Sequence, residues 1–459
     1  MLVVVVLLAA GVRVVGLDRP AHFVFDERYY VPPACRAAFG DEPACSTPSP
    51  YDAHPPLGKW LIATGIRALG LHPVGWRMAA AVVGSATVGV LYVAARRLLG
   101  STLAAAVAAG LLAIDFLHIV HSRLAMLDVF LTFFVVFAFL AYVLDREQTR
   151  ALREASGSRR PRLRPWQVFA GVAAGAAMAV KWSGALILGA VAILSMLDAS
   201  TTGSHPRQRR GRLACAGLAL RTTTPLAAIA AAVYLAAHLT ATPGTLLTWP
   251  WEPGARLRTA LAVELQRVRT QTALPFGYLG ETGPWTWPSG LPPILYSVER
   301  VDRTVFAAIL ALGNPAAWWP AILVLAAMFV RFWRNAEWPS PDLVILVAFL
   351  ANYLPWWLIY LVRPVYLFHF LPAVPFLYLA VARTGGLMAA SSRGGRVALG
   401  TYLAVTGLVF CLAAPVVIGM PVSLTPLYHP PANYLFVRLP NCSAVQLVPA
   451  PADAQPEPC

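Results

Sequence analysis

The chain has 459 residues, of which 58% are hydrophobic and 12% are charged, and its formal net charge at pH 7 is +15. Apolar runs long enough to cross a membrane recur along the whole length, which excludes an ordinary soluble protein. The basic excess is not accompanied by an aromatic-and-basic module or a DNA-binding motif, so it does not indicate a nucleic-acid partner.

Membrane-spanning helices are predicted from one end of the chain to the other. The first apolar run, "MLVVVVLLAAGVRVVG", is interpreted as a transmembrane helix, because no small-residue cleavage site with a soluble domain follows it. Hydropathy predicts about eleven spans, at 1–17, 75–95, 101–118, 123–144, 166–180, 182–198, 213–239, 304–330, 341–361, 364–382 and 397–419.

The arginines indicate how these spans are oriented. The chain has 34 Arg and two Lys, and 18 of the Arg fall in five short connections between spans. By the positive-inside rule, these connections and the N-terminus face the cytoplasm. The long segments 18–74, 240–303 and 420–459 then lie outside, and "ARLRTALAVELQRVRTQ" in the second of them is predicted to form an interfacial helix.

These assignments divide the chain into four parts and predict an all-α membrane protein with interfacial helices in the first and a later outer loop. No strand pattern is apparent. The parts are 1–239, a transmembrane part with outer loop 18–74 that carries most of the polar groups; 240–303, an outer loop; 304–419, a transmembrane part of four helices; and 420–459, an outer tail.

Four cysteines lie in segments that are predicted to be outside. Cys35 and Cys45 share the first outer loop, and Cys442 and Cys459 share the tail. An oxidising exterior favours pairing within each couple. The alternative is that some of these thiols are free.

Two clusters of polar residues occur in the first outer loop. Asp26–Glu27 follows the first span, and the alternative to a chemical role is an ordinary helix N-terminus. In "YDAHPPLGKW" the two prolines prevent a helix through His54 and favour one that begins after them. Asp52 and His54 would then lie at the start of this helix with Lys59 one turn in; the alternative is a rigid turn with a snorkelling Lys.

Further ionisable residues are predicted at or inside the outer ends of spans. Asp128 falls within a span, where charged side chains are costly and commonly functional, and Arg123 or Arg77 is its expected partner in either a functional or a structural ion pair. Lys181, at an outer helix end, suits the phosphate of a lipid. Arg363 and His369 lie at the outer end of the span at 364–382, where an interfacial belt is the alternative.

The type of donor follows from the predicted topology. No "HExxH"-like spacing indicates a metal site, and no Gly-rich phosphate loop indicates a nucleotide site. Because the polar groups are on the outer side, a sugar nucleotide is an unsuitable donor. A donor that is available outside the cell and in the membrane has to be carried by a lipid.

The motifs resemble those of a known family. "FDE", "DAHPPLGK", "SRLAMLD" and "KWSG", with weaker support from "YLFHFLPAVPF" and "PWTWP", are similar in order and spacing to the protein O-mannosyltransferases. These are polyprenyl-phosphate-mannose–protein mannosyltransferases of the GT-C membrane fold. The chain looks like an actinobacterial member without the inserted soluble domain, and it departs from the family in "LPFGYLGETG", the lead into "PWTWP", which lacks a His.

The resemblance implies a role for each polar cluster. Asp26 would be the general base in an inverting transfer of mannose to Ser or Thr hydroxyls of exported proteins. Glu27 would be the second residue of the catalytic pair and would hold the acceptor peptide or the sugar hydroxyls. No cofactor is firmly implied, although a divalent cation stays open, and no metal ligands are predicted. The residues expected to bind substrate are Asp52, His54, Lys59, Arg77, Arg123, Asp128, Lys181, Arg363 and His369.

The implied partners are a polyprenyl-phosphate-mannose donor, exported polypeptides, membrane lipid and the secretion translocon. The implied location is the plasma membrane, with the site on the extracytoplasmic side. Three other functions are kept open: a GT-C enzyme that glycosylates a lipid or a cell-wall glycan, a transporter, and a non-catalytic membrane subunit. The position of the polar residues on the outer side, and the lack of a visible repeat, disfavour the transporter.

Overall fold

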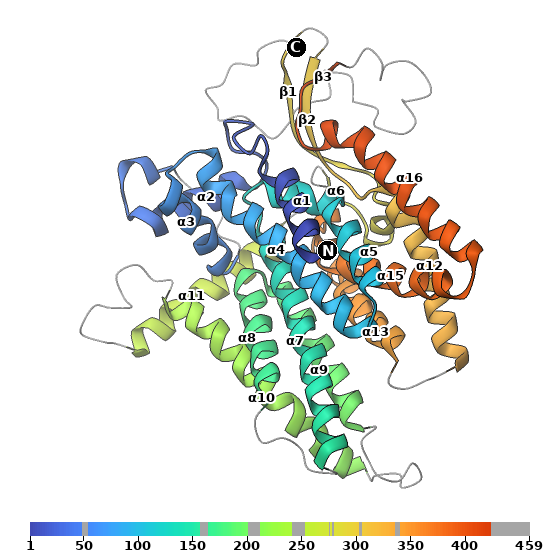
Figure 1. The fold of residues 1–459 in the computed structure, drawn as a ribbon. Helices are drawn as coiled ribbons and strands as arrows, with labels where there is room; N and C mark the ends of the chain where they lie inside the picture. The colour runs from blue at the N-terminus through green and yellow to red at the C-terminus, as the bar shows by residue number, and fades with distance from the viewer. Residues whose placement is uncertain are drawn as a thin grey trace.

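The fold is that of a multi-pass membrane protein made mainly of α-helix (Figure 1). The computed structural model describes residues 1–47, 54–156, 164–200, 212–240, 253–274, 276–277, 280–302, 305–335 and 340–423. Eight of the described helical segments are long and apolar enough to cross a membrane. They are α4 (Pro73–Leu99), α7 (Leu127–Ser156), α9 (Ala185–Ser200) with the 3₁₀ turn η2 (Trp182–Gly184), α10 (Arg212–Thr240), α12 (Pro315–Asn335), α13 (Pro341–Tyr353) with α14 (Pro355–Ile359), α15 (Val374–Ser391) with η4 (Leu367–Ala373), and α16 (Arg393–Val417).

One predicted span is bent in the middle. Helices α5 (Thr102–Ala113) and α6 (Phe116–Arg123) meet at 59° and would make a ninth described span if counted together. The bend occurs at Asp115, whose carboxylate accepts the His118 backbone N–H at 2.8 Å and so starts α6 as an N-cap. Its other oxygen accepts hydrogen bonds from Trp318 and Tyr378, which tie the bend to the C-terminal helices.

Two other predicted spans are apolar but short. They are α1 (Leu2–Val14) and α8 (Pro165–Val180). At a rise of about 1.5 Å per residue, neither would cross a hydrocarbon core of roughly 30 Å by itself. The total of about eleven spans therefore stays a prediction.

The segments that are predicted to be outer loops contain shorter helices. They are α2 (Glu27–Phe39), the 3₁₀ turn η1 (Pro43–Cys45), α3 (Leu57–Leu69), α11 (Pro253–Thr272) and the 3₁₀ turn η3 (Pro284–Ser289). Helix α3 begins directly after Pro55–Pro56, as the sequence predicts, because proline fits the first turn of a helix and breaks an interior.

A small sheet corrects the expectation of an all-helical chain. Strands β1 (Ile294–Arg300), β2 (Val305–Ala311) and β3 (Val422–Ser423) form an antiparallel sheet in that order. The predicted helix at 304–330 is therefore wrong over its first part, and α12 begins only at Pro315. The run "VFAAILA" is apolar throughout, so its pattern does not distinguish strand from helix; pairing with β1 does.

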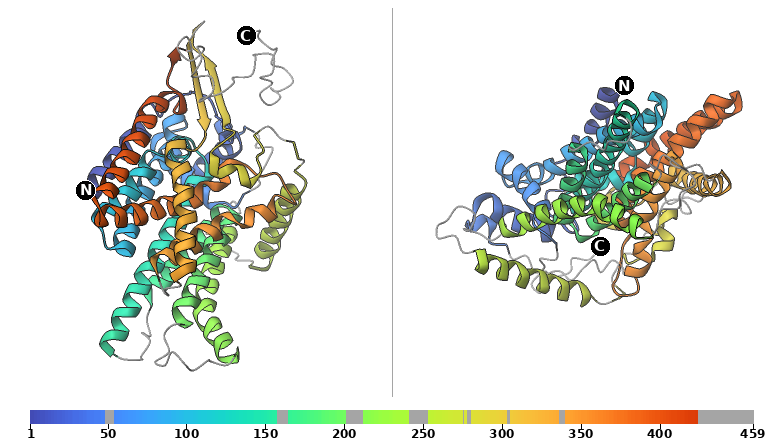
Figure 2. Two further views of the ribbon diagram at one scale, coloured as in Figure 1. Left: turned by 90° about the vertical axis from the view of Figure 1, so that its right-hand side faces the viewer. Right: turned by 90° about the horizontal axis from the view of Figure 1, so that it is seen from below.

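Four of the helices extend to the end of the molecule opposite the sheet. Helices α7, α8, α9 and α10 extend together away from the sheet, as both Figure 1 and the left view of Figure 2 show. The ends of these helices that border the Arg-rich segments 145–164 and 204–212 are therefore remote from β1–β3. This arrangement agrees with the prediction that these two groups of segments belong to opposite sides of the membrane.

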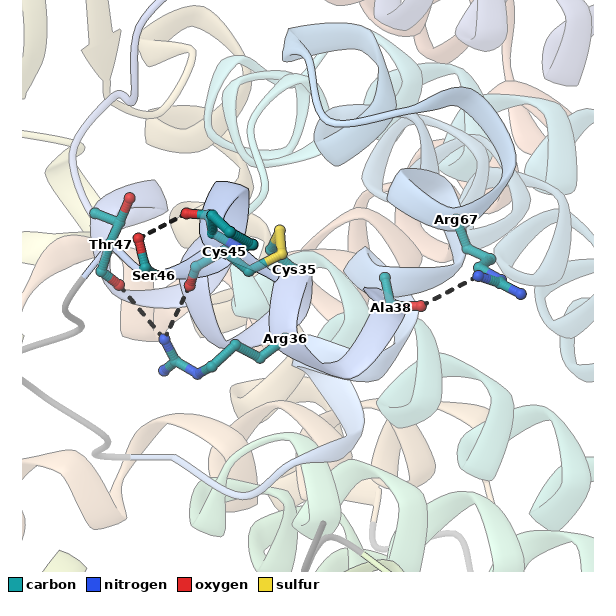
Figure 3. Close-up of a disulfide and its surroundings, with 8 residues drawn as sticks. Cys35, Arg36, Ala38, Cys45, Ser46, Thr47 and Arg67 are labelled. Atoms are coloured by element: carbon teal, nitrogen blue, oxygen red, sulfur yellow. Dashed lines mark hydrogen bonds between the residues drawn. A yellow bond between two sulfur atoms is a disulfide. The ribbon is translucent and has the colours of Figure 1, made fainter. Parts of the chain in front are cut away.

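The predicted disulfide in the first outer loop is confirmed. Cys35 in α2 and Cys45 in η1 are bonded, with their Cα atoms 5.4 Å apart (Figure 3). The Arg36 guanidinium donates to the Cys45 carbonyl at 3.3 Å, so the same turn is held from a second side. The other proposed pair, Cys442 and Cys459, lies outside the described residues.

Candidate active site

Asp26 stands at the N-terminus of α2, but its side chain makes no capping hydrogen bond to the helix. Its carboxylate instead accepts the Tyr30 hydroxyl at 3.0 Å. The preceding residue, Phe25, has a φ of +50°, a left-handed conformation that is strained for a bulky side chain. Phe25 stacks on Tyr296 of β1 with ring centroids 4.0 Å apart, which holds the strained turn in place.

The surroundings of Asp26 make its carboxyl group a suitable base. Burial raises the pKa of Asp26 to about 6, against the opposing effects of the Lys181 charge and the Tyr30 hydrogen bond. A base works best when its pKa lies near the working pH, so this carboxyl group is poised for proton transfer. A helix cap, the alternative drawn from the sequence, does not account for this environment.

Lys181 and Asp128 form a buried ion pair beside Asp26. The Lys181 Nζ lies 2.9 and 2.8 Å from the two carboxylate oxygens of Asp128, and both side chains are almost fully buried. Lys181 is extended between α8 and η2, and its Nζ lies 5.2 Å from the centroid of the Phe368 ring. The predicted partners of Asp128, Arg123 and Arg77, are wrong, because both guanidinium groups are committed elsewhere.

Arg77 is paired with Glu27, and both side chains are fully buried. Its Nε and Nη2 each donate to Glu27 at 2.8 Å. The remaining donors bind three carbonyl groups in the loop after α1, those of Leu17, Pro20 and His22. All five N–H donors of the guanidinium therefore have acceptors, and Arg77 fixes the path of the loop that leads to Asp26.

Glu27 is equally committed. Besides Arg77, its two oxygens accept the backbone N–H groups of Val24 and Ala125 at 2.9 Å. Each oxygen thus accepts two hydrogen bonds, which is the ordinary capacity of a carboxylate. Asp26 and Glu27 are adjacent in sequence but have different environments. The Asp26 side chain is half-buried beside Lys181, whereas the Glu27 carboxylate is fully buried and joins α2 to α4 and to the backbone at Ala125.

Arg123 closes the C-terminal end of α1. Its guanidinium donates to the carbonyl groups of Val12, Arg13, Val15 and Gly16 at 2.6 to 3.3 Å. Carbonyl groups at a helix end lack partners within the helix and carry a partial negative charge, which a buried cation satisfies. The guanidinium of Arg123, one of the residues expected to bind substrate, is thus hydrogen-bonded to the backbone at the end of α1.

His54 and Lys59 lie on the turn that opens α3. The Lys59 Nζ donates to the His54 carbonyl at 2.8 Å, so the lysine stabilises this turn, as in the rigid-turn alternative. Burial, followed by the positive charges of Lys181, Lys59, Arg363 and Arg267, lowers the pKa of His54 well below its usual value. A neutral His54 is thus surrounded by cations. Asp52 lies outside the described residues.

His369 is set among aromatic rings. Its Nδ1 accepts the Tyr366 backbone N–H at 3.0 Å, and its ring stacks on Trp356 with centroids 4.2 Å apart. The Nδ1 acceptor leaves the proton of the neutral ring on Nε2. Trp287 of "PWTWP" is fully buried nearby, with ring centroids 6.2 Å from His369, which brings two of the motifs together.

The structure adds residues that were not among the expected site residues. Tyr296 of β1 and His121 of α6 are hydrogen-bonded at 2.9 Å, and His121 Nδ1 lies 3.9 Å from Asp128. Glu264 of α11 accepts a hydrogen bond from Trp182, the residue after Lys181. Trp182 lies in "KWSG", His121 directly precedes "SRLAMLD", and Glu264 lies in the predicted interfacial helix, whereas Tyr296 comes from a segment in which no strand was predicted.

A metal site is not found in the part of the chain that the structure describes. There, no group of three or more His, Cys, Asp or Glu side chains is placed to hold a metal ion.

The fold is that of the GT-C membrane glycosyltransferases, and the family matches place the chain in this class. Two family profiles match the chain: "Dolichyl-phosphate-mannose-protein mannosyltransferase" over residues 70–242, and "C-terminal four TMM region of protein-O-mannosyltransferase" over 280–429. The chain is a member of this protein mannosyltransferase family, as its motifs indicated.

Curated relatives support the assignment over nearly the whole length. The polyprenol-phosphate-mannose–protein mannosyltransferase of Mycobacterium tuberculosis is 32% identical over 443 residues, which cover 87% of this chain and 84% of the relative. That of Mycolicibacterium smegmatis is 30% identical and covers 93% and 90%. In fold, the chain resembles the Saccharomyces cerevisiae Pmt1-Pmt2 protein O-mannosyltransferase complex bound to the sugar donor, with a TM-score of 0.72, 14% identity, and coverage of 91% and 90%.

Proposed function

We propose that this protein transfers mannose from a polyprenyl-phosphate-mannose donor to Ser or Thr hydroxyls of exported polypeptides, with inversion at the anomeric carbon. The observation that carries the proposal is the environment of Asp26, whose pKa is raised to about 6 beside Lys181. The names of the curated relatives support the same donor and a protein acceptor.

The chemistry is a single displacement. Asp26 removes the proton from the acceptor hydroxyl while that oxygen bonds to the anomeric carbon. The bond from this carbon to the phosphate oxygen breaks, and the electron pair leaves with the lipid phosphate. A β-linked donor then gives an α-mannoside. Lys181 stabilises the negative charge that develops on the phosphate, as a fixed cation does best in a dry site.

The other predicted residues divide into two groups. His54, Lys59, Arg363 and His369, together with Asp52, are proposed to surround the sugar, the phosphate or the acceptor. Glu27, Arg77 and Arg123 are proposed to be positioning residues, because their polar atoms are engaged with the backbone or with one another. Asp128 orients Lys181 through the ion pair.

We also propose that the site faces the exterior of the plasma membrane. The concentration of Arg in the opposite connections and the Cys35–Cys45 disulfide support this orientation. Acceptors would reach the site as extended chains during export, so the secretion translocon is a proposed neighbour.

A reconstituted assay tests the function. Protein in liposomes is expected to move labelled mannose from a synthetic polyprenyl-phosphate-mannose to a Ser/Thr peptide, and mass spectrometry should find hexose on the hydroxyl residues. The matched control is the same peptide with Ala at those positions. Label that enters added lipid or glycan acceptors and leaves the peptide unmodified would favour the alternative acceptor class.

Lys181→Met is expected to raise the donor concentration needed for half-maximal rate by about tenfold or more, because a charge-assisted contact to phosphate is lost. The substitution also leaves Asp128 buried without its cation. The double variant Lys181→Met, Asp128→Asn removes that stranded charge and should recover protein yield but not donor affinity. If the double variant reaches half-maximal rate at the same donor concentration as the parent protein, Lys181 does not bind the phosphate.

A further inference from the structure

Helix α11 exposes a stripe of three apolar residues and buries two polar ones. Leu261, Leu265 and Val268 share one face by their spacing, and they are 54%, 59% and 45% exposed. Arg267 and Gln271 on the same helix are buried. A surface helix in water has the opposite arrangement. The inverted pattern suits a helix whose apolar stripe faces lipid and whose polar stripe faces the protein.

Glu264 is the centre of the polar contacts between α11 and the protein. One carboxylate oxygen accepts the Tyr234 hydroxyl at 2.6 Å and the Trp182 indole N–H at 3.0 Å. The other accepts His238 Nε2 at 2.8 Å and the Arg267 guanidinium. The contacts join three elements, because Tyr234 and His238 belong to α10 and Trp182 belongs to η2.

The partners of Glu264 keep it ionised. Burial by itself would raise the pKa of Glu264, but hydrogen bonds from His238, Tyr234 and Arg267 outweigh burial and lower the pKa to about 2. Hydrogen bonds to a charged acceptor are stronger than neutral ones. The carboxylate is thus a strong junction between α11 and the membrane-spanning helices.

This junction is next to the proposed donor site. Trp182 directly follows Lys181, the residue proposed to hold the lipid phosphate. On the other side of the junction, the positive charge of Arg267 acts on His54. Helix α11 therefore contacts the segment that carries Lys181 and presents a cation toward the turn at His54, while its apolar stripe is exposed.

We propose that Glu264 is a positioning residue whose hydrogen bonds, called the latch, hold α11 against η2 and α10. Helix α11 then forms one wall of the site for the polyprenyl-phosphate donor. The lipid tail would run along Leu261, Leu265 and Val268, and the phosphate would lie on the inner side toward Lys181. The identity of the donor rests on the proposed function. The latch itself rests only on the contacts of Glu264.

The variant Glu264→Gln tests the latch in protein reconstituted into nanodiscs. Hydrogen exchange of α11 amides is expected to increase, while exchange in α8 stays unchanged. In the transfer assay, KM for the polyprenyl-phosphate-mannose donor should rise about tenfold, with kcat at saturating donor and KM for the peptide within about twofold. Gln266→Ala, an exposed neighbour on the same helix, is the matched control and should behave as the parent protein.

A second variant covers the case in which Glu264→Gln does not fold. Trp182→Phe keeps an aromatic ring and removes only the N–H that joins η2 to the junction, and it should change exchange and donor KM in the same directions by less. Unchanged exchange in α11 would overturn the latch. Faster exchange with an unchanged donor KM would overturn its role in donor binding. If the parent protein transfers nothing, the proposed function fails, and the exchange measurement still decides the latch.

Discussion

Asp26→Asn is expected to lower the rate of mannosyl transfer by about 10²–10⁴-fold, the usual contribution of a positioned general base. Asn has the same shape as Asp and can still accept the Tyr30 hydroxyl, which lies 3.0 Å from the carboxylate. The folded structure and the amount of protein in the membrane should therefore not change. The measurement is the initial rate with saturating donor and peptide, per molecule of reconstituted protein.

The pH dependence gives an independent check of the same assignment. A base has to be ionised to act, and burial raises the pKa of Asp26 to about 6. Transfer by the parent protein should thus increase as the pH rises through about 6 and decline at lower pH. The residual activity of Asp26→Asn should lack this acidic limb. A variant with nearly the parent rate, or with the same limb, would show that another group is the base.

The spans and the polar clusters could be predicted from sequence because both follow from the free-energy cost of placing polar groups in a membrane. A membrane requires long apolar helices, and an ionisable side chain next to them is expensive unless it is paired or functional. Asp26, Lys181 and Asp128 stood out for this reason. The pairing of Asp128 with Lys181 could not be predicted, because it depends on how α7 packs against α8, and hydropathy carries no information about that packing.

The roles of Asp26 and Glu27 could not be separated for a similar reason. Successive residues at a helix start point in directions about 100° apart. The placement of the start of α2 against α4 decides which of the two carboxylates pairs with Arg77. In the structure, Glu27 pairs with Arg77 and Asp26 lies beside Lys181. Glu264 escaped notice because an acidic residue on an amphipathic helix normally indicates a solvated face.

Arg77→Met is expected to have the largest effect on stability. The change removes five hydrogen bonds and leaves the Glu27 carboxylate fully buried without its cation. Breaking one side of a buried ion pair costs about 3–5 kcal/mol. We expect a lower free energy of unfolding by about that amount, measured by SDS titration in mixed micelles, and a lower yield of folded protein in the membrane.

A double-mutant cycle separates a scaffold role for Glu27 from a catalytic one. Glu27→Gln alone should also destabilise the protein, because Arg77 then keeps its charge without a carboxylate. The double variant Arg77→Met, Glu27→Gln leaves neither member of this ion pair charged. Its loss of stability should therefore be smaller than the sum of the losses in the two single variants. If Glu27 is a positioning residue, the transfer rate per folded molecule should recover with stability in the double variant. If that rate instead falls by a factor comparable to the loss in Asp26→Asn, Glu27 takes part in the chemistry and the scaffold role is insufficient.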